Sequence, residues 1–516
     1  MSQKQHLFQL IKSLTISEKG YFKKYYTKYG ENQAYLQLFD AIDGQETYDE
    51  ESLKKRFKDK GFVKQFSVAK NYLIKNVMRG LRAYYSESSK DIQLHELLID
   101  IELLYKRRLI SQCRKVIKRA KKIALEAELF NKYSEIALWE LRLYILEPFS
   151  DRAAKQVEAI QAFAEEGSEK DKNLVGYRHL AYHVFKRSMK EGTSRKQEDM
   201  KAFVDMYAKN DLLKDTNQAI SITALGGYHN LWSKLYEIQY DYQSSYEASL
   251  AFVKLIQGNP SIFEDYVSAI VIPAHYNLLV TCAYLNKKES FFENLDYLKR
   301  VPDIYKQSDK VIRRILDFYC TNIELLYYVQ NAYFKEAIDV IPKAAELVAD
   351  KSNNSLGFLF IKIEMCYTIA YAYFGVEDYD KSIDWINKII QEERIELRED
   401  LLCYAHLLSL INHFELNNYK YISYKLRTTH NYISKMRKSY NFERTALKFI
   451  KKMLRVKDKT EMKNTIQAYK GKFEEISKDP FEQEAFKNFD ITSWLDSKLT
   501  GTEFAKIAAL KREKEK

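Results

Sequence analysis

Histidine pairs are the residues whose spacing comes nearest to a metal site. His179 and His183 lie four residues apart, so a helix would place both imidazoles on one face, where two of them can hold one metal ion. No further ligand follows at a suitable spacing, and tyrosines surround the pair, which favours histidines that pack within the fold. His406 and His413, with Glu415 beyond them, receive the same interpretation. We therefore predict no metal site and no cofactor.

The common catalytic signatures are missing from the sequence. It has no Gly-rich phosphate loop, no Gly-Lys-Ser/Thr, no nucleophile elbow and no His-Glu-x-x-His. An enzyme with an unrecognised site would need a deep pocket lined by ionisable groups with strongly shifted pKa values. We propose no catalytic residue and predict that the protein is not an enzyme.

The five cysteines are far apart, and each lies among helix-forming apolar residues. They are Cys113, Cys282, Cys320, Cys366 and Cys403. We expect buried, reduced thiols. The N-terminus has no pattern of a signal peptide, and no continuous apolar stretch reaches the length of a membrane span. These observations predict a cytoplasmic protein.

Basic residues near the N-terminus support an alternative function. Helices predicted over residues 51–58 and 65–84 flank a short break, an order compatible with a helix-turn-helix that contacts nucleic acid. The second helix would present Lys64, Gln65, Ser67, Lys70 and Asn71 to phosphates and base edges. The same pattern arises in any helix pair that caps a larger array, and there these side chains would face water.

Charge is unevenly distributed along the chain. Residues 1–125 carry 26 Lys or Arg against 14 Asp or Glu, residues 420–516 carry 24 against 13, and the middle carries 33 against 44. In the first segment, basic residues recur on one face of a predicted helix, opposite Ile110, Ile117 and Ala120. Basic ends would attract DNA or RNA and an acidic middle a basic peptide, or the ends would hold the middle within one chain.

The composition predicts an all-α fold. Gly (15) and Pro (6) are scarce among 516 residues, which removes most of the turns that strands require. A chain of this length exceeds a single compact core, so we expect several domains or an array of repeated units. Gly226 and Gly227 interrupt one helical pattern, which indicates close approach of two helices or, as the alternative, a ligand contact.

Internal repeats indicate how the helices are arranged. Before Tyr379, an apolar helix with the small residue Ala370 ends in a short turn, and a second amphipathic helix with Ser382 follows. The pattern resembles a tetratricopeptide repeat (TPR). Ala370 matches the small residue of the first helix, Tyr373 the aromatic residue near its end, and Tyr379 the aromatic residue that opens the second helix. Ser382 and Ile386 match the small and large inward places of that helix.

The repeat departs from the family pattern and is longer than its standard unit. Cys366 stands where the family has Trp, Ile389 stands where it has a small residue, and no Pro closes the unit. Similar openings of second helices recur at Tyr246, Phe291, Phe334 and Tyr419. With Tyr379, these positions are 45, 43, 45 and 40 residues apart. The resemblance implies a right-handed α-solenoid of TPR-like helical hairpins with extended repeats.

Three segments follow from this pattern. We predict an N-terminal helical domain at 1–86, the solenoid at 87–440, and C-terminal capping helices with a basic tail at 441–516. The first segment has a capping box, Thr15 with Glu18, and an apolar helical stripe. The stripe consists of Phe66, Ala69, Leu73, Val77 and Leu81. Turns are predicted at 148–151 and 165–172, and a polar loop at 190–197.

The resemblance also implies where a partner binds, because the first helices of such hairpins line a groove. The corresponding residues are Tyr276, Tyr319, Asn322, Glu364, Tyr367, Tyr371 and Tyr404. Tyrosine offers a rigid surface with one hydrogen-bonding group, although the same residues could instead pack between repeats. We predict a non-catalytic scaffold or adaptor that binds a peptide or helix of a protein partner. The alternative is a nucleic-acid-associated regulator that uses residues 1–125, with the repeats as its sensor.

Overall fold

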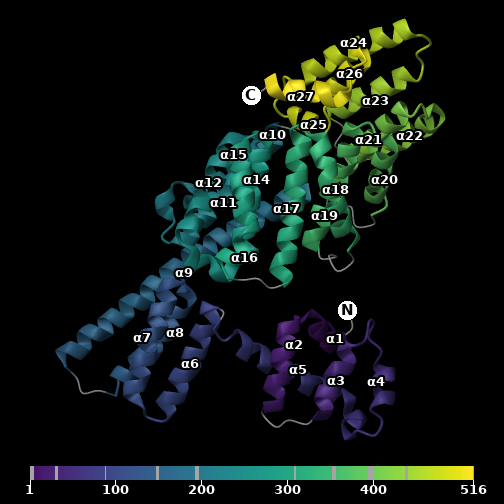
Figure 1. The fold of residues 1–516 in the computed structure, drawn as a ribbon. Helices are drawn as coiled ribbons and strands as arrows, with labels where there is room; N and C mark the ends of the chain where they lie inside the picture. Colours follow the sequence, from purple (N-terminus) through teal and green to yellow (C-terminus); the bar gives the residue numbers. More distant parts are fainter. Residues whose placement is uncertain are drawn as a thin grey trace. The chain divides into compact units, whose positions relative to one another are not determined.

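The computed structural model describes a chain of helices (Figure 1). The described residues are 5–28, 33–87, 89–146, 150–191, 197–306, 310–350, 356–392, 399–435 and 440–514. Within these ranges no strand occurs, and the all-α prediction is confirmed. Residues 148 and 149 of the turn predicted at 148–151 and residues 192–196 of the loop predicted at 190–197 lie outside them. The chain divides into an N-terminal unit, Met1–Glu169, and a C-terminal unit, Lys170–Lys516, and the predicted boundaries at 86 and 440 stay predictions.

Eight helices and the start of a ninth form the described part of the N-terminal unit. They are α1 (His6–Ser13), α2 (Ile16–Lys28), α3 (Gln33–Asp43), α4 (Glu50–Arg56), α5 (Phe66–Tyr85), α6 (Lys90–Lys106), α7 (Ile110–Glu126), α8 (Tyr133–Tyr144) and α9 (Asp151–Glu191). The capping box is confirmed, since the Thr15 N–H donates to Glu18 Oε2 at 2.6 Å and the Glu18 N–H to Thr15 Oγ1 at 3.2 Å. The α5 stripe is buried at four of its five residues, and Leu81 is half-buried.

The turn predicted at 165–172 is wrong, because α9 continues through it as one helix. Gly167 does not end the helix. It leaves room for Tyr133, whose side chain a Cβ at this position would overlap. The Tyr133 ring also stacks on Phe163 with centroids 4.3 Å apart. The glycine and the polar residues around it therefore mark a close helix contact and an exposed face, and not a chain reversal.

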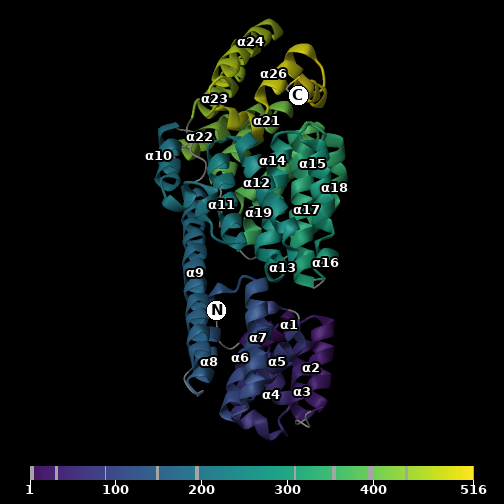
Figure 2. The same ribbon diagram turned by 90° about the vertical axis from the view of Figure 1, so that its left-hand side faces the viewer.

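Five helical hairpins follow in the C-terminal unit (Figure 2). They pair α11 (Ile222–Ile238) with α12 (Tyr242–Gly258), α14 (Ile272–Tyr284) with α15 (Lys288–Lys299), α17 (Lys310–Gln330) with α18 (Phe334–Ala349), α19 (Leu356–Gly375) with α20 (Tyr379–Ile390), and α21 (Glu399–Glu415) with α22 (Tyr419–Lys435). From α12 to α20, each second helix packs against the first helix of the next hairpin. The first helices α14, α17, α19 and α21 also pack in succession.

Further helices precede, interrupt and follow the hairpins. They are α10 (Gln197–Ala208), α13 (Pro260–Phe263), α16 (Val301–Ile304), α23 (Asn441–Met453), α24 (Lys459–Ile476), α25 (Gln483–Asn488), α26 (Ile491–Thr500) and α27 (Phe504–Lys514). One stretch of the described residues, Pro260–Tyr284, is long and apolar enough to cross a membrane by length and composition alone. Since 56% of its most apolar window is buried among the hairpins, it also has the character of a core helix.

One backbone turn closes all five hairpins. A residue with positive φ ends each first helix, and these residues are Tyr240, Asn286, Ala332, Glu377 and Asn417, at intervals of 46, 46, 45 and 40. At Glu377 the N–H donates to the Phe374 carbonyl at 3.0 Å, and the next N–H donates to the Tyr373 carbonyl at 2.9 Å. This pair of bonds is the Schellman arrangement, which satisfies carbonyls that the helix end leaves open. The second helix begins two residues after the turn.

The recurrent turn corrects the positions predicted from aromatic residues. Phe334, Tyr379 and Tyr419 open their helices, as predicted. The helices α12 and α15 instead begin at Tyr242 and Lys288, about one turn before the predicted Tyr246 and Phe291. Phe291 is fully buried inside its helix, so its ring packs where a smaller residue lies in α20. An aromatic residue alone therefore does not locate the opening.

The close approach predicted for Ala370 and Ser382 is confirmed. Both are fully buried, and Ser382 Oγ donates to the Ala370 carbonyl at 2.8 Å, which joins α20 to α19. Ser245 Oγ makes the same bond across twelve residues, to the Ser233 carbonyl at 2.9 Å. A small side chain at this place allows the backbones to approach and uses a lone pair that the helix leaves free.

Two further expectations about small residues are confirmed. A Cβ at Gly226 would lie 2.5 Å from Phe252, and one at Gly227 would lie 3.0 Å from Tyr177, so α11 touches both α12 and α9 closely. All five cysteines are buried and free. Burial raises the pKa of the Cys320 thiol to about 12, so this thiol stays protonated and unreactive at neutral pH.

The turn residues other than glycine give a test of this fold. At Ala332, φ is 60°, a conformation that costs an L-residue about 1–2 kcal/mol and glycine very little. We expect Ala332→Gly to stabilise the protein by roughly 0.5–1 kcal/mol, measured by urea unfolding. The control is Ala345→Gly inside α18, which should cost about 1 kcal/mol. Equal destabilisation by the two changes would contradict the recurrent turn.

Candidate functional site

Four of the seven predicted groove residues meet in one polar cluster on the first helices. Asn322 on α17 donates through Nδ2 to the Tyr276 hydroxyl on α14 at 2.7 Å and to Glu364 Oε2 on α19 at 3.3 Å. The Tyr319 ring lies edge-on to the Tyr276 ring, with centroids 4.8 Å apart. Because α14, α17 and α19 pack in succession, three helices supply one cluster. We call these four residues the inner polar cluster.

Burial determines how the inner polar cluster behaves. Asn322 is fully buried, and within the described residues its Oδ1 has no hydrogen-bond partner. Burial, together with the Glu364 carboxylate, raises the pKa of Tyr276 well above its usual value, so the phenol stays protonated. A buried acceptor without a partner is costly, and a ligand that donates a hydrogen bond there would remove that cost.

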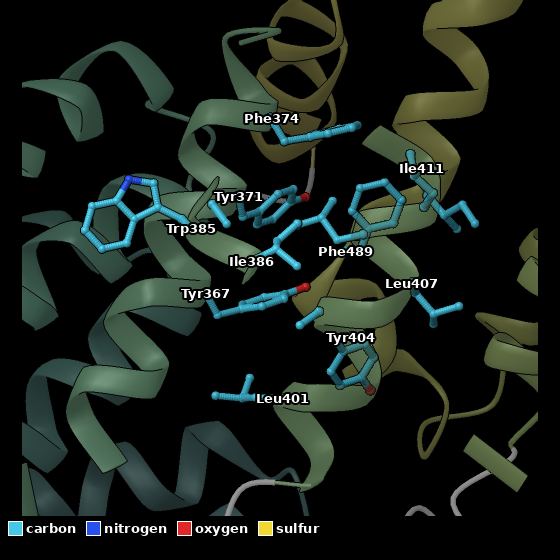
Figure 3. Close-up of a cluster of buried hydrophobic side chains, with 14 of the residues drawn as sticks. Tyr367, Tyr371, Phe374, Trp385, Ile386, Leu401, Tyr404, Leu407, Ile411 and Phe489 are labelled. Atoms are coloured by element: carbon cyan, nitrogen blue, oxygen red, sulfur yellow. The ribbon is translucent and has the colours of Figure 1, made fainter. Parts of the chain in front are cut away.

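Two other predicted groove residues bind the C-terminal part of the chain itself. The Tyr367 hydroxyl donates to the Asn488 carbonyl at 3.0 Å, and the Tyr371 hydroxyl accepts from the Asp490 N–H at 3.0 Å. Between them Phe489 is extended, with φ −150° and ψ 114°, and its ring lies near that of Tyr371, with centroids 5.7 Å apart (Figure 3). Two tyrosine hydroxyls on α19 thus hold an extended backbone.

Residues 482–511, which we call the C-terminal segment, also reach the turn ends of other hairpins. Trp494 Nε1 and Lys498 Nζ donate to the two oxygens of Glu415, both at 2.5 Å, and Tyr242 donates to Glu484 Oε2 at 2.9 Å. Trp494 is only 1% exposed. The segment is therefore part of the hairpin core and not a loosely attached tail.

A buried ion pair fixes the start of α26 in this segment. Burial by itself would raise the pKa of Asp490, but the Lys511 ammonium at 2.8 Å and the hydroxyl of Ser493 at 2.7 Å lower it below its usual value. Asp490 also accepts from the Ser493 N–H at 3.1 Å and so caps α26. A single carboxylate therefore joins α27 to the first turn of α26.

The seventh predicted groove residue, Tyr404 on α21, is 7% exposed and belongs to the large apolar cluster of the C-terminal unit. Figure 3 shows it between Leu401 and Leu407 on α21. Its position matches the alternative interpretation, in which tyrosines pack between repeats. Of the seven predicted groove residues, four form the inner polar cluster, two bind the backbone of the C-terminal segment, and one packs in the core.

A cavity of about 1040 Å³ lies where the C-terminal helices meet the turns after α14 and α17. Its charged groups are largely matched: Lys470 pairs with Asp496 at 2.7 Å, and Lys487 lies 3.6 Å above the Tyr242 ring. The hydrogen bond to Asp496 raises the pKa of Lys470, so this amine stays protonated at neutral pH and cannot act as a base.

The predicted histidine pairs differ from each other. His179 and His183 are exposed, with their Nε2 atoms 3.1 Å apart, so the prediction that they pack within the fold is wrong. They lie on the side of α9 away from the buried Leu180 and Val184. His406 is buried against Tyr432, as predicted. In the described part of the chain no three His, Cys, Asp or Glu side chains gather as metal ligands.

The predicted nucleic-acid contacts lie on α5 and on the short helix η2 (Gly61–Gln65) before it. Four of the five are exposed: Lys64, Gln65, Ser67 and Asn71. Lys70 differs, because it pairs with Glu50 of α4 at 2.6 Å and its side chain is 13% exposed. Its charge therefore joins the two helices.

Sequence reasoning missed three further basic residues on α5. Lys75, Arg79 and Arg82 are exposed and recur every three to four residues, a spacing that places them on one side of a helix. That spacing, in a helix without a carboxylate, was the pattern that could have located them. On α7, the predicted basic face is present, with Lys115, Lys118, Arg119 and Lys122 exposed and Ile117 and Ala120 buried.

Comparison with models of known protein families finds none that matches the chain, and comparison with curated proteins also finds none.

Two buried histidines predict how stability depends on pH. Burial lowers the pKa of His275 and of His406 to about 4, while an unfolded histidine titrates near 6.5. The unfolded state therefore binds more protons between pH 6.5 and 4, and stability falls as the pH falls through this range. We expect each histidine to cost about 2 kcal/mol between pH 7 and pH 5.

The measurement is urea unfolding of the wild type and of His275→Gln at both pH values. The variant should lose about 2 kcal/mol less stability than the wild type on acidification. The control is His179→Gln, at an exposed side chain. Between pH 7 and pH 5 this variant should lose as much stability as the wild type. Identical pH dependence of all three proteins would show that His275 is not buried in its neutral form.

Proposed function

We propose that the C-terminal unit is a right-handed α-solenoid of TPR-like hairpins that binds a segment of a partner protein and catalyses no reaction. Support for the repeat comes from the common turn and from the successive packing of first and second helices. The observation that carries the binding proposal is the pair of hydrogen bonds that Tyr367 and Tyr371 form with the backbone of residues 488–490. This contact shows the chemistry that the first helices can offer to a polypeptide.

The spacing of the two tyrosines explains why they fit an extended chain. Residues four apart on a helix lie side by side, with Cβ atoms about 5–6 Å apart. In an extended chain each residue advances about 3.3 Å, so groups two residues apart are separated by about 6–7 Å. The carbonyl of Asn488 and the N–H of Asp490 lie on either side of the extended Phe489, and each bonds one of the two hydroxyls. The match depends on backbone groups, so it suits any extended segment.

The inner polar cluster is the part of the first helices that we assign to the partner. Asn322 Oδ1 lacks a partner among the described residues, and Glu364 contributes a carboxylate. Both groups accept hydrogen bonds, so they favour a segment rich in donors, such as a basic peptide. The acidic middle of the chain would attract the same peptide over a longer range. We place this interaction in the cytoplasm, where buried cysteines remain reduced.

A second candidate function, nucleic-acid binding by the N-terminal unit, is favoured by the charge of α5. This helix has no Asp or Glu, and Lys75, Arg79 and Arg82 extend the exposed basic residues at its start. Such a row of cations suits a phosphate backbone. The ion pair between Lys70 and Glu50 removes one of the predicted contacts from this row.

A photo-crosslinking amino acid in place of Tyr319 tests the first proposal in the native cell. We expect it to capture a protein, because Tyr319 belongs to the inner polar cluster. The control carries the same amino acid at Tyr182, which is 60% exposed on α9. Glu364→Gln should lower the yield at position 319 roughly tenfold, since it removes a charged acceptor. The same captured proteins at both positions would contradict the proposal.

Charge reversal on α5 tests the second candidate. We expect the full chain with Lys75→Glu, Arg79→Glu and Arg82→Glu to elute from immobilised DNA or RNA at lower salt than the wild type. The matched control reverses the exposed residues Lys115, Lys118 and Lys122 of α7. If both triple variants shift elution equally, binding follows net charge and α5 has no specific role.

A further inference from the structure

Helix α22 (Tyr419–Lys435) has a composition unlike that of its neighbours. Its 17 residues include no Asp or Glu. Lys420, Arg427 and His430 are exposed, and Lys425, which is half-buried, donates to the Tyr421 hydroxyl at 3.2 Å. Among the described residues, none of these four side chains forms an ion pair. The helix therefore presents positive charge that no carboxylate in the described part of the chain neutralises.

Three tyrosines interrupt these cations and are exposed to solvent. Tyr419 is 45% exposed, Tyr421 43% and Tyr424 76%. The helix itself is firmly attached, because Ile422 and Ile433 on its opposite side are buried to 0% and 1% exposure. Tyr421 also lies against the His413 ring, with centroids 4.2 Å apart, and Tyr419 lies edge-on to Phe414, so Tyr424 is the most exposed ring of the three.

The tyrosines and cations alternate at helical spacing. Tyr424 lies four residues after Lys420 and three before Arg427, so both cations flank its ring. Tyr421 is flanked by Lys425 at the hydrogen-bond distance given above. Tyr421 and Tyr424 therefore each have a cation beside them at helical spacing.

Helix α23, which packs against α22, extends the positive charge. Its exposed cations Arg444, Lys448 and Lys451 recur every three to four residues, and the exposed Lys452 pairs with Glu461 at 3.2 Å. Its single carboxylate, Glu443, is 2% exposed and turned into the core. Together the two helices expose cations and tyrosines and no carboxylate within the described residues.

We infer that α22, with the adjacent cations of α23, is a binding surface for single-stranded nucleic acid. Lysine and arginine bind phosphates, and exposed aromatic rings stack on bases. In a duplex the flat faces of the bases are covered by their neighbours, so the tyrosines can contribute only to a single strand. This surface lies on a second helix, so it is independent of the inner polar cluster.

Other anionic partners fit the surface less well. A membrane surface would favour Leu, Ile, Phe or Trp as inserting side chains, and the exposed aromatic residues of α22 are all tyrosines. An acidic protein would pair with the cations and would not require three flat rings. The combination of unpaired cations with exposed tyrosines is the feature that selects a single strand.

Fluorescence anisotropy of the full-length protein with a labelled 20-nucleotide oligothymidylate and the matching RNA tests this inference. We expect Tyr421→Ala with Tyr424→Ala to raise Kd at least about tenfold, because stacking is lost. Lys420→Gln with Arg427→Gln should reduce the slope of log Kd against log salt by roughly 1.4, the value for two phosphate contacts on a single strand. All four side chains are exposed, so the variants should fold.

The controls are Tyr182→Ala, at a ring 60% exposed on α9, and Lys254→Gln, at an exposed lysine of α12. Neither should change Kd by more than about twofold. The inference is overturned if no oligonucleotide binds at 50 mM salt, if duplex DNA binds as tightly as the single strand, or if loss of both tyrosines has no effect. Tighter binding to phosphatidylserine vesicles or to polyglutamate than to the oligonucleotides would also overturn it.

Discussion

The hairpin closure is the constraint on which the rest of the C-terminal unit depends. In all five hairpins the first helix ends at a residue with positive φ, and the second helix begins two residues later. So short a connection forces the helices to lie against each other, and the Ser382 hydroxyl on the Ala370 carbonyl shows how near they come. A hairpin cannot bury its apolar faces alone, so the hairpins pack in succession. That packing aligns α14, α17 and α19 and creates the inner polar cluster.

The C-terminal segment covers part of the first helices and occupies two of their tyrosines. Its buried Trp494 and Phe489 cover apolar surface that the first helices would otherwise expose, which is the role that a terminal cap has in repeat proteins. The same contacts use Tyr367 and Tyr371, so these residues are not open to another polypeptide. The proposed partner is left with the inner polar cluster, whose buried Asn322 Oδ1 has no hydrogen-bond partner among the described residues.

Charge is organised by helix rather than by the ends of the chain. Carboxylates are consumed in structural contacts: Glu50 holds Lys70 and Glu415 holds Trp494 and Lys498. The helices α5 and α22 contain no carboxylate at all, and most of their cations, Lys70 and Lys425 apart, are exposed. Positive surfaces therefore result where acidic residues are absent from a helix, and the net charge of a whole segment does not locate them.

Features that depend on residues close together in the chain could be predicted from the sequence pattern. The all-α class, the capping box of Thr15 and Glu18 and the approach of Ser382 to Ala370 each depend on residues within about one hairpin, so periodicity and small residues were sufficient to predict them. The repeat pattern predicted the residues of the inner polar cluster as groove residues. No pattern in the sequence indicated the hydrogen bonds that they share. Only tertiary structure decided that α9 continues through residues 165–172 and that residues 488–490 occupy Tyr367 and Tyr371. Those contacts join residues more than a hundred positions apart or depend on a facing helix, and neither leaves a local trace in the sequence.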